Sequence, residues 1–282
     1  YSTVDFWSSD GCFCIGNSDL LISRYVYYAL VCHENTLRSK VRFAGIPTLD
    51  ATAVERIEIP VPPLAVQEEI VKILDTFSTL EAELEAELEA RKKQYEYYRE
   101  ELLTFGDEVE EVQLSKLAFY STSRIDASKL DMHNYVGADN LLQDKRGKML
   151  SNYVPTNGKL TKYENGDILI GNIRPYLKKI WFSTNTGGTN GDVLVIRIKE
   201  CERKNLTSKF LYHLLASEDF FNYCMQFSKG AKMPRGDKTA IMKYPISIPP
   251  LAEQQRIASI LDKFDALVND ISIGLPAELK AR

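Results

Sequence analysis

The side chains best suited to chemistry lie in the segment from Gly171 to Trp181. It holds one arginine, two lysines and an asparagine beside a tyrosine and a tryptophan. Arginine and asparagine read the edges of guanine and adenine, whereas lysine neutralises phosphate. We therefore expect this segment to contact a nucleic acid. The alternative is a strand, loop and strand with a hydrated basic edge.

A second basic segment, 228–238, carries four cations among glycines and a proline. Glycine lets backbone amides approach a phosphate closely, so this predicted loop also suits an anionic partner. The alternative is a surface turn between a helix and the final strand. A partial echo of the segment at 43–50 favours a structural role for Met233 and Pro234.

Signs of a reaction centre are weak. Asp192, Glu202 and Lys204 have the residue types of a metal-dependent nuclease but lack its sequence context. The sequence has no Walker phosphate loop, no dinucleotide-binding glycine motif and no nucleophile–base set. We expect a protein without catalysis of its own.

Four residues near the start could hold a zinc ion, although their spacing is unfamiliar and ordinary thiols are the simpler reading. They are Cys12, Cys14, Cys32 and His33. The remaining histidines, His133 and His213, are isolated, and we expect packed or surface roles for them.

Composition narrows the class of protein. The net charge is −4, with 44% apolar and 26% charged residues. The negative charge gathers in 75–111, while 141–182 and 228–243 are basic, so one face should meet an anion. No apolar run approaches the ~20 residues that span a bilayer. Five cysteines without a disulfide pattern favour a reducing compartment, by default the cytoplasm.

The sequence repeats itself. Residues 62–77, PPLAVQEEIVKILDTF, match 249–264, PPLAEQQRIASILDKF, at an offset of 187 residues. Weaker matches continue upstream, where 23–27 correspond to 208–212. Such a repeat predicts two copies of one structural unit, which suits a target with two half-sites.

Each repeated block predicts a helix that begins after a proline pair. The first carries apolar residues in 4-3 spacing from Ile70 to Leu102, which is typical of a long coiled-coil helix. The second meets Gly274-Leu275-Pro276, where we expect a kink or a brief break. We expect the two helices to pack antiparallel.

The expected fold is mixed α/β (α+β), with two pseudo-repeated globular domains separated by two long antiparallel coiled-coil helices. Strands are predicted at 167–170 and 192–198, and helical spacing at 208–221. The expected boundaries are 1–61, the C-terminal part of a first globular domain whose front is missing; 62–105, the first helix; 106–248, the second globular domain; and 249–282, a shortened second helix.

These blocks together resemble the specificity subunits of type I restriction-modification systems. The resemblance rests on the doubled Pro-Pro-Leu-Ala-x-Gln block, on 166–179, on Met233-Pro234-Arg235 and on the run 90–99. It implies two target-recognition domains that each read one half of a bipartite DNA sequence, and helices that set the gap between the halves.

The resemblance also implies partners. Methyltransferase (modification) subunits using S-adenosylmethionine would methylate adenine, and a restriction and translocase subunit using ATP and Mg would complete the nuclease. The chain itself would need no cofactor, and its ligand would be double-stranded DNA. The rival hypothesis is a coiled-coil scaffold that binds other proteins.

The expected DNA contacts come from the two basic segments. Arg174 and Asn172 would read bases and the lysines would bind phosphates, with Lys40 and Arg42 as weaker candidates in the first domain. The full set is Asn172, Arg174, Tyr176, Lys178, Lys179, Lys229, Lys232, Arg235 and Lys238.

Overall fold

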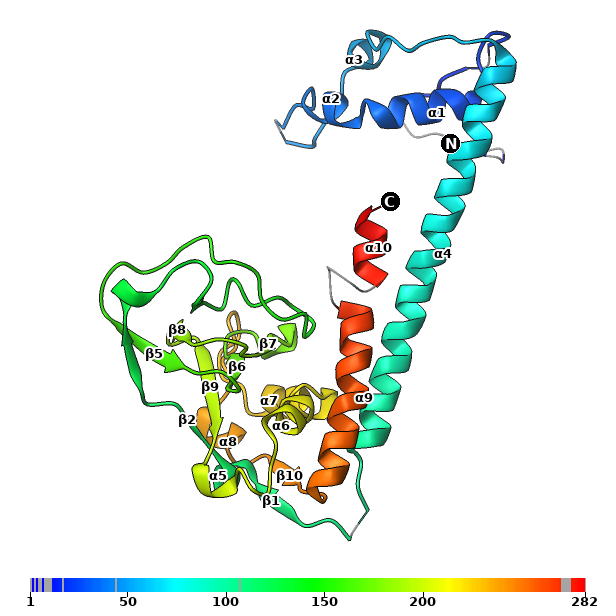
Figure 1. Ribbon diagram of the computed structural model, residues 1–282. Helices are drawn as coiled ribbons and strands as arrows, with labels where there is room; N and C mark the ends of the chain where they lie inside the picture. The colour runs from blue at the N-terminus through cyan, green and yellow to red at the C-terminus, as the bar shows by residue number, and fades with distance from the viewer. Residues whose placement is uncertain are drawn as a thin grey trace. The chain divides into compact units, whose positions relative to one another are not determined.

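The computed structural model describes residues 2, 4, 7, 12–16, 18–43, 45–106, 108–269 and 275–281. The chain divides into two compact units, residues 1–86 and 87–282 (Figure 1). The expected break at Gly274 lies outside the described residues, but helix α9 (Leu251–Asn269) is followed by a separate helix, α10 (Leu275–Ala281).

The longer regular elements described in the first unit are helices. It contains α1 (Ser23–Cys32), α2 (Glu34–Arg38), α3 (Ala51–Glu55) and the N-terminal part of α4 (Leu64–Leu103). Tyr25 is buried and its hydroxyl donates a hydrogen bond to the carbonyl of Pro60, which fixes α1 against the segment leading into α4.

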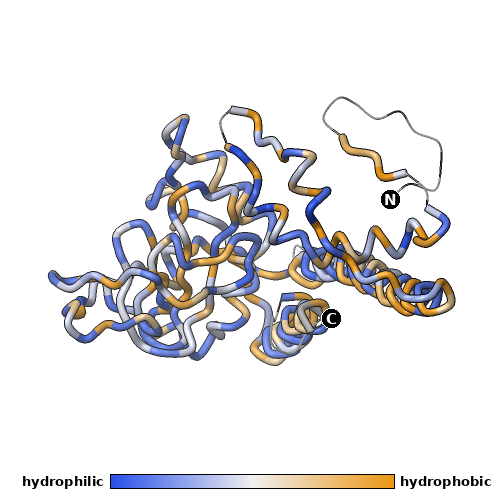
Figure 2. Tube along the Cα trace, turned by 90° about the horizontal axis from the view of Figure 1, so that it is seen from above, coloured by the Kyte–Doolittle hydropathy of each residue, from blue (hydrophilic) through white to orange (hydrophobic). Residues whose placement is uncertain are grey.

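Helix α4 is the long helix that the heptad spacing predicts. Its 40 residues make it about 60 Å long at 1.5 Å per residue. In Figure 2 hydrophobic and hydrophilic residues alternate along its turns. The apolar residues in 4-3 spacing along α4 form one stripe, which we call the apolar seam. The seam is buried at Leu84 and Tyr95, but Phe77 is 56% exposed. The seam is thus covered along only part of its length.

The second unit is mixed α/β, as expected, and contains three antiparallel or mixed sheets. The strand orders are β2-β9-β6-β7, β3-β5-β8-β4 and β1-β10. The strands are β1 (Glu111–Gln113), β2 (Ala118–Tyr120), β3 (Arg124–Asp126), β4 (Tyr135–Val136), β5 (Lys159–Tyr163), β6 (Ile168–Gly171), β7 (Ile180–Phe182), β8 (Gly187–Thr189), β9 (Val193–Ile198) and β10 (Pro245–Ser247).

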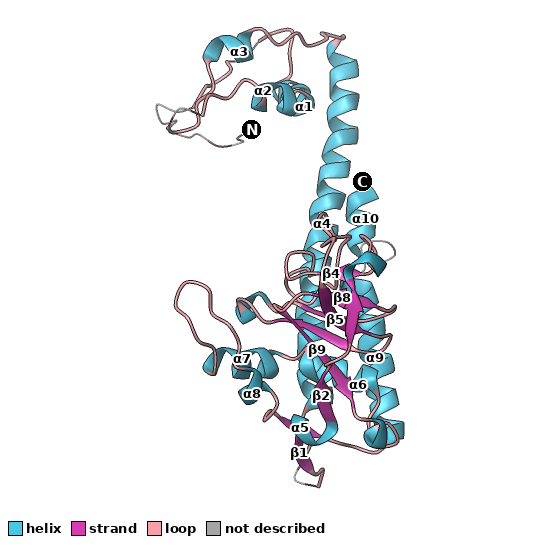
Figure 3. Ribbon diagram, turned by 90° about the vertical axis from the view of Figure 1, so that its left-hand side faces the viewer, coloured by secondary structure: helices cyan, strands magenta, loops and turns pink. Residues whose placement is uncertain are grey.

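The two strands predicted from sequence form the centre of the first of these sheets. β6 and β9 pair antiparallel, with Ile168 opposite Ile196 and Ile170 opposite Leu194. Both are buried on both faces, which accounts for their continuous apolar sequence. Figure 3 shows the strands gathered together, with helices α6 and α9 beside them.

The helix predicted at 208–221 is two helices, which corrects the expectation of one. α6 (Ser208–Leu215) ends before Ser217, whose side chain caps α7 (Glu218–Gln226) by accepting from the amide of Phe220. Ser217 favours a new helix over continuation of α6, because its hydroxyl accepts a hydrogen bond from an otherwise free amide at the start of α7. The other short helices here are α5 (Leu114–Leu117) and α8 (Lys238–Ile241).

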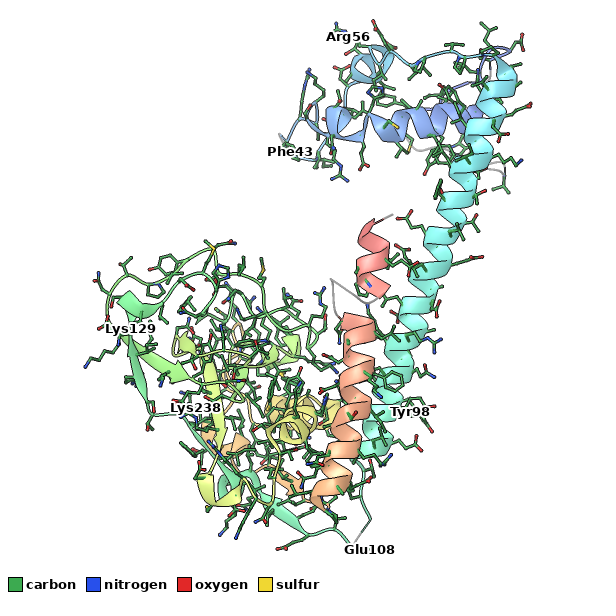
Figure 4. All side chains as sticks on the ribbon, viewed as in Figure 1. Phe43, Arg56, Tyr98, Glu108, Lys129 and Lys238 are labelled. Atoms are coloured by element: carbon green, nitrogen blue, oxygen red, sulfur yellow. The ribbon has the colours of Figure 1, made fainter. Side chains whose placement is uncertain are left out.

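Within the second unit the C-terminal half of α4 lies along α9. The rings of Tyr95 and Tyr98 stack on Phe264, with centroids 5.9 and 5.5 Å away, and the hydroxyl of Tyr95 faces Asp265. The two helices run in opposite directions there in Figure 1, and Figure 4 labels Tyr98 at this contact. Within this unit, aromatic side chains of α4 and α9 therefore contact each other.

The repeat recurs in the hydrogen bonds of the two units. The buried amide of Gln254 accepts from the backbone of Thr207 and donates to the carbonyls of Asn205 and Pro249. Gln67 makes the same three bonds in the first unit, 187 residues earlier. Its partners are the backbones of Ile22, Leu20 and Pro62. Gln67 thus joins the start of α4 to the segment before α1, and Gln254 joins the start of α9 to the segment before α6.

Candidate nucleic-acid interface

The two basic segments, predicted separately, meet in the structure. The amide of Arg174 donates to the carbonyl of Pro234 at 2.7 Å, and the amide of Gly236 donates to the carbonyl of Asn172 at 3.1 Å. Ile173 and Arg235 form a β-bridge between them. Residues 172–178 and 229–238 therefore make one surface, which we call the basic loop pair.

Regular elements hold both loops at their ends. The first loop leaves β6 at Gly171 and enters β7 at Ile180, and the 3₁₀ turn Pro175–Leu177 lies between them. The second follows α7 and ends at Asp237, whose carboxylate caps α8. A Cβ at Gly236, where the loops touch, would lie 2.8 Å from the side-chain oxygen of Asn172, so the Asn172 side chain would have to shift.

Four of the expected contact residues are exposed, and their side chains make no hydrogen bond or ion pair with any described residue. They are Arg174, Tyr176, Lys232 and Lys238, the last labelled in Figure 4. Three cations and an aromatic ring on one loop pair can meet phosphates and a base without first breaking a contact within the protein.

The other expected contacts are engaged with the protein. Lys229 pairs with Asp237 at 2.7 Å and Arg235 with Asp192 at 3.0 Å, although both cations remain exposed. The ammonium of Lys229 holds the pKa of Asp237 down at about 2. These pairs lie at the surface, where water screens them, so both cations can still face an anion.

Three further expected contacts are less accessible. Lys178 pairs with Glu218 at 2.6 Å, and the ammonium of Lys179 donates to the carbonyl of Ala138. Burial lowers the pKa of Lys179 below its usual value. Asn172 is buried, and its backbone rather than its side chain joins the two loops. Sequence alone could not reveal these partners, because Glu218 and Ala138 are about 40 residues away along the chain.

The first unit contains a counterpart of the second loop. Arg42 bridges Thr48 as Lys229 bridges Arg235, and Arg42 faces Asp50 as Lys229 faces Asp237. The offset is again 187 residues. Lys40 and Arg42 are exposed. The sequence comparison did not detect this repeated ion pair, because its cation is an arginine at position 42 and a lysine at position 229.

Nothing in the described residues gathers the other candidates into a reaction centre. Asp192 and Glu202 lie at opposite ends of β9, whose six residues span about 20 Å, so they cannot share a metal ion. No group of three His, Cys, Asp or Glu side chains among the described residues could hold one. Cys14 and Cys32 are exposed free thiols, and Cys12 is exposed as well.

His133 is exposed and His213 is fully buried, in line with the surface and packed roles expected for them. No helix in the described part of the chain is both long and apolar enough to cross a membrane.

Comparison with known families decides the class of protein. The model of the type I restriction modification DNA specificity domain matches residues 1–90 and 108–281. The chain belongs to this family. It is a type I specificity subunit, a component that recognises DNA targets and does not itself catalyse a reaction. The resemblance seen in the sequence is confirmed.

Two curated relatives and two solved structures agree. The chain is 29% identical to the EcoR124I/EcoR124II specificity subunit of Escherichia coli, over 95% of this chain and 69% of that protein. It is 32% identical to a type I restriction enzyme specificity subunit of Haemophilus influenzae, over 98% and 72%.

The crystal structure of the type I S subunit from M. genitalium matches with a TM-score of 0.58 at 13% identity, over 93% of this chain and 70% of that one. A structure from work on assembly of the type I restriction-modification system matches with a TM-score of 0.55 at 17% identity, over 91% and 67%. These two likenesses establish the fold.

Proposed function

We propose that this specificity subunit reads a bipartite DNA sequence and directs adenine methylation and restriction there. The observation that carries the proposal is the basic loop pair, in which exposed Arg174, Tyr176, Lys232 and Lys238 lie on two loops joined by backbone hydrogen bonds. In this proposal Arg174 reads a base edge, Tyr176 contacts a base or sugar, and the lysines bind phosphates.

The bipartite target follows from the repeat. Both units place a cation and an aspartate on the same loop, and both join that loop region to a long helix. In the proposed arrangement two target-recognition domains, at 1–61 and 106–248, are separated by two antiparallel helices, at 62–105 and 249–282. The stacking of Tyr95 on Phe264 supports that helix pair.

A specificity subunit assembles with other subunits. The specific partners we propose are methyltransferase subunits that carry S-adenosylmethionine, and a restriction and translocase subunit that uses ATP and Mg. Apolar side chains exposed along one face of α4, at Ile73, Phe77 and Leu80, support docking of a protein on this helix. Because the target is DNA, we place the complex in the cytoplasm.

Deletion of the gene tests the function. Sequencing that detects modified adenines should show loss of methylation at one split motif in the deletion strain, and its return on complementation. An unchanged pattern of methylation would instead favour the protein-binding scaffold.

A second test addresses the contact surface. If six of the expected cationic contacts touch phosphates, the affinity for DNA should fall with a log–log salt slope of about −5. A slope near zero would exclude this set of contacts.

A further inference from the structure

Backbone strain is concentrated beside the basic loop pair. Among the described residues, four that are not glycine have a left-handed φ: Asp144 at 55°, Lys145 at 62°, Arg174 at 51° and Lys178 at 48°. This conformation is unfavourable for residues that carry a Cβ, so it persists where the surroundings enforce it. All four lie on two turns, 143–147 and 174–178.

The two turns are bonded to each other. The amide of Asp144 donates to the carbonyl of Leu177, and the amide of Lys145 donates to the carbonyl of Lys178, both at 3.0 Å. The turn 174–178, which presents Arg174 and Tyr176, thus takes its shape partly from a segment about thirty residues earlier in the chain.

A buried ammonium group, that of Lys145, fixes the turn 143–147. Lys145 has a side chain only 7% exposed, and its Nζ donates to Glu96 of α4 at 2.8 Å and to Glu218 of α7 at 3.0 Å. The other oxygen of Glu218 accepts from Lys178 at 2.6 Å. Glu218 therefore joins a lysine from each turn. Burial alone would raise the pKa of Glu218, but the two lysines outweigh it and lower that pKa.

We propose that Lys145 is a positioning residue for DNA recognition. Held by Glu96 and Glu218, it fixes the turn 143–147, and through that turn it sets the direction in which Arg174 and Tyr176 leave the protein. A guanidinium that must meet two acceptors on one base edge tolerates little error in direction. The inference rests on the proposed function, because it assumes that the basic loop pair reads DNA.

The structure also indicates that a substitution at Lys145 leaves the fold intact. Without this ammonium Glu218 keeps Lys178, and Glu96 keeps the guanidinium of Arg99 at 3.3 Å. Neither carboxylate is left without a cation. Methionine matches the length and apolar stem of lysine, so Lys145→Met removes the bridge while filling its volume.

The experiment uses the complex purified from its own host through a tag on the full chain. Binding is measured on a duplex that carries the split motif found by methylation sequencing, and on a scrambled duplex. Lys145→Met should weaken binding to the motif by about tenfold or more, the effect of losing one well-placed base contact. Binding to the scrambled duplex should change less than about twofold, because the phosphate contacts remain.

Four further variants sharpen the test. Lys145→Arg retains the charge and should restore most of the discrimination. Glu218→Gln should reproduce the loss, and combining it with Lys145→Met should add little, since both changes break one network. Lys162 lies on β5 and pairs with Glu164, and Lys162→Met should leave the discrimination between the two duplexes unchanged.

Wild-type discrimination retained in Lys145→Met would overturn the inference while leaving the proposed function standing. An equal loss on both duplexes, accompanied by a fall in melting temperature, would assign Lys145 a merely structural role and would also overturn it. A wild-type complex that binds both duplexes equally would defeat the proposed function, and the inference with it.

Discussion

The carboxylate of Asp262 accepts a hydrogen bond from the ring of His213 at 2.8 Å, at the place where Asp75 accepts from the hydroxyl of Tyr28 at 2.6 Å in the first unit. The cation beside each pair is also repeated, as Lys209 in one unit and Arg24 in the other. The two units thus anchor their long helices with corresponding contacts, but the donor is a tyrosine in one unit and a histidine in the other. Histidine is the side chain that ordinarily changes its charge between pH 5 and 8.

This difference predicts that acid destabilises the second unit first. Burial lowers the pKa of His213 below 6.5, against the opposing effect of Asp262; Arg99 also lowers it, and Asp265 raises it. The unfolded chain therefore binds more protons below pH 6.5, and the free energy of unfolding falls as the pH falls. Hydrogen exchange in α6, corrected for intrinsic rates, should rise between pH 7.5 and pH 5.5 more than exchange in α1.

Replacing His213 with glutamine keeps a donor for Asp262 and removes the titration. The pH dependence of α6 between 7.5 and 5.5 should then flatten. A wild-type α6 whose protection does not change over this range would show that His213 is not the group responsible. At lower pH the pKa of Asp262, which is itself lowered, predicts a further loss of stability below about 3.8 in both proteins.

The glutamine at the start of each long helix should be a main anchor of its unit. Gln254→Ala leaves an amide and two carbonyls without their partners, at a cost of roughly 3–5 kcal/mol in the free energy of unfolding. Urea unfolding followed by the fluorescence of Trp181 measures it. Gln255→Ala, one residue further on and exposed, should change the stability by less than about 0.5 kcal/mol.

Removal of single arginines should separate base reading from general attraction to DNA. Arg174→Ala should weaken binding to the motif by about 1–3 kcal/mol and broaden the methylated motif at one position. A motif that stays unchanged in methylation sequencing would remove Arg174 from the base-reading set.

Arg235 has a matched control in Arg203. Both are exposed arginines in surface ion pairs, with side chains 59% and 57% exposed, and β9 separates Asp192, the partner of Arg235, from the turn that holds Arg203. Arg235→Ala should reduce the salt slope of DNA binding by about 1, whereas Arg203→Ala should leave it unchanged. Equal slopes in the two variants would argue against phosphate contact at Arg235.

The length of α4 should set the gap between the two half-sites. Inserting four residues before Glu81 adds about one helical turn, a rise of about 6 Å. Base pairs are spaced about 3.4 Å apart, so the methylated motif should gain one or two base pairs in its gap while both halves stay the same. A gap of unchanged length would contradict the role of the helix as a spacer.

The sequence predicted the local features of this protein well. Strands β6 and β9 follow from continuous apolar runs, and α4 follows from its proline pair and heptad spacing. The family followed from blocks that occur in order and in duplicate. Each of these signals lies within one stretch of chain.

The features that the sequence did not predict depend on distant partners. The contact of Ile173 with Arg235 joins two loops sixty residues apart, and the position of Lys178 depends on Glu218. Lys145 gave no signal, because a lysine beside Arg146 and Lys148 has the pattern of a hydrated basic surface rather than a buried bridge. The surroundings of such residues depend on the path of the chain at turns and on contacts between segments that are distant in sequence.

The glutamine anchor has a consequence for how recognition can diversify. Gln67 and Gln254 bond only to backbone atoms of the segments they hold, so they place no demand on the side chains there. A foreign recognition segment could therefore keep these bonds, whereas the contacts of Asp75 and Asp262 would still require particular side chains. Backbone-only bonds of this kind would allow recognition domains to be exchanged during evolution while the rest of the complex stays constant.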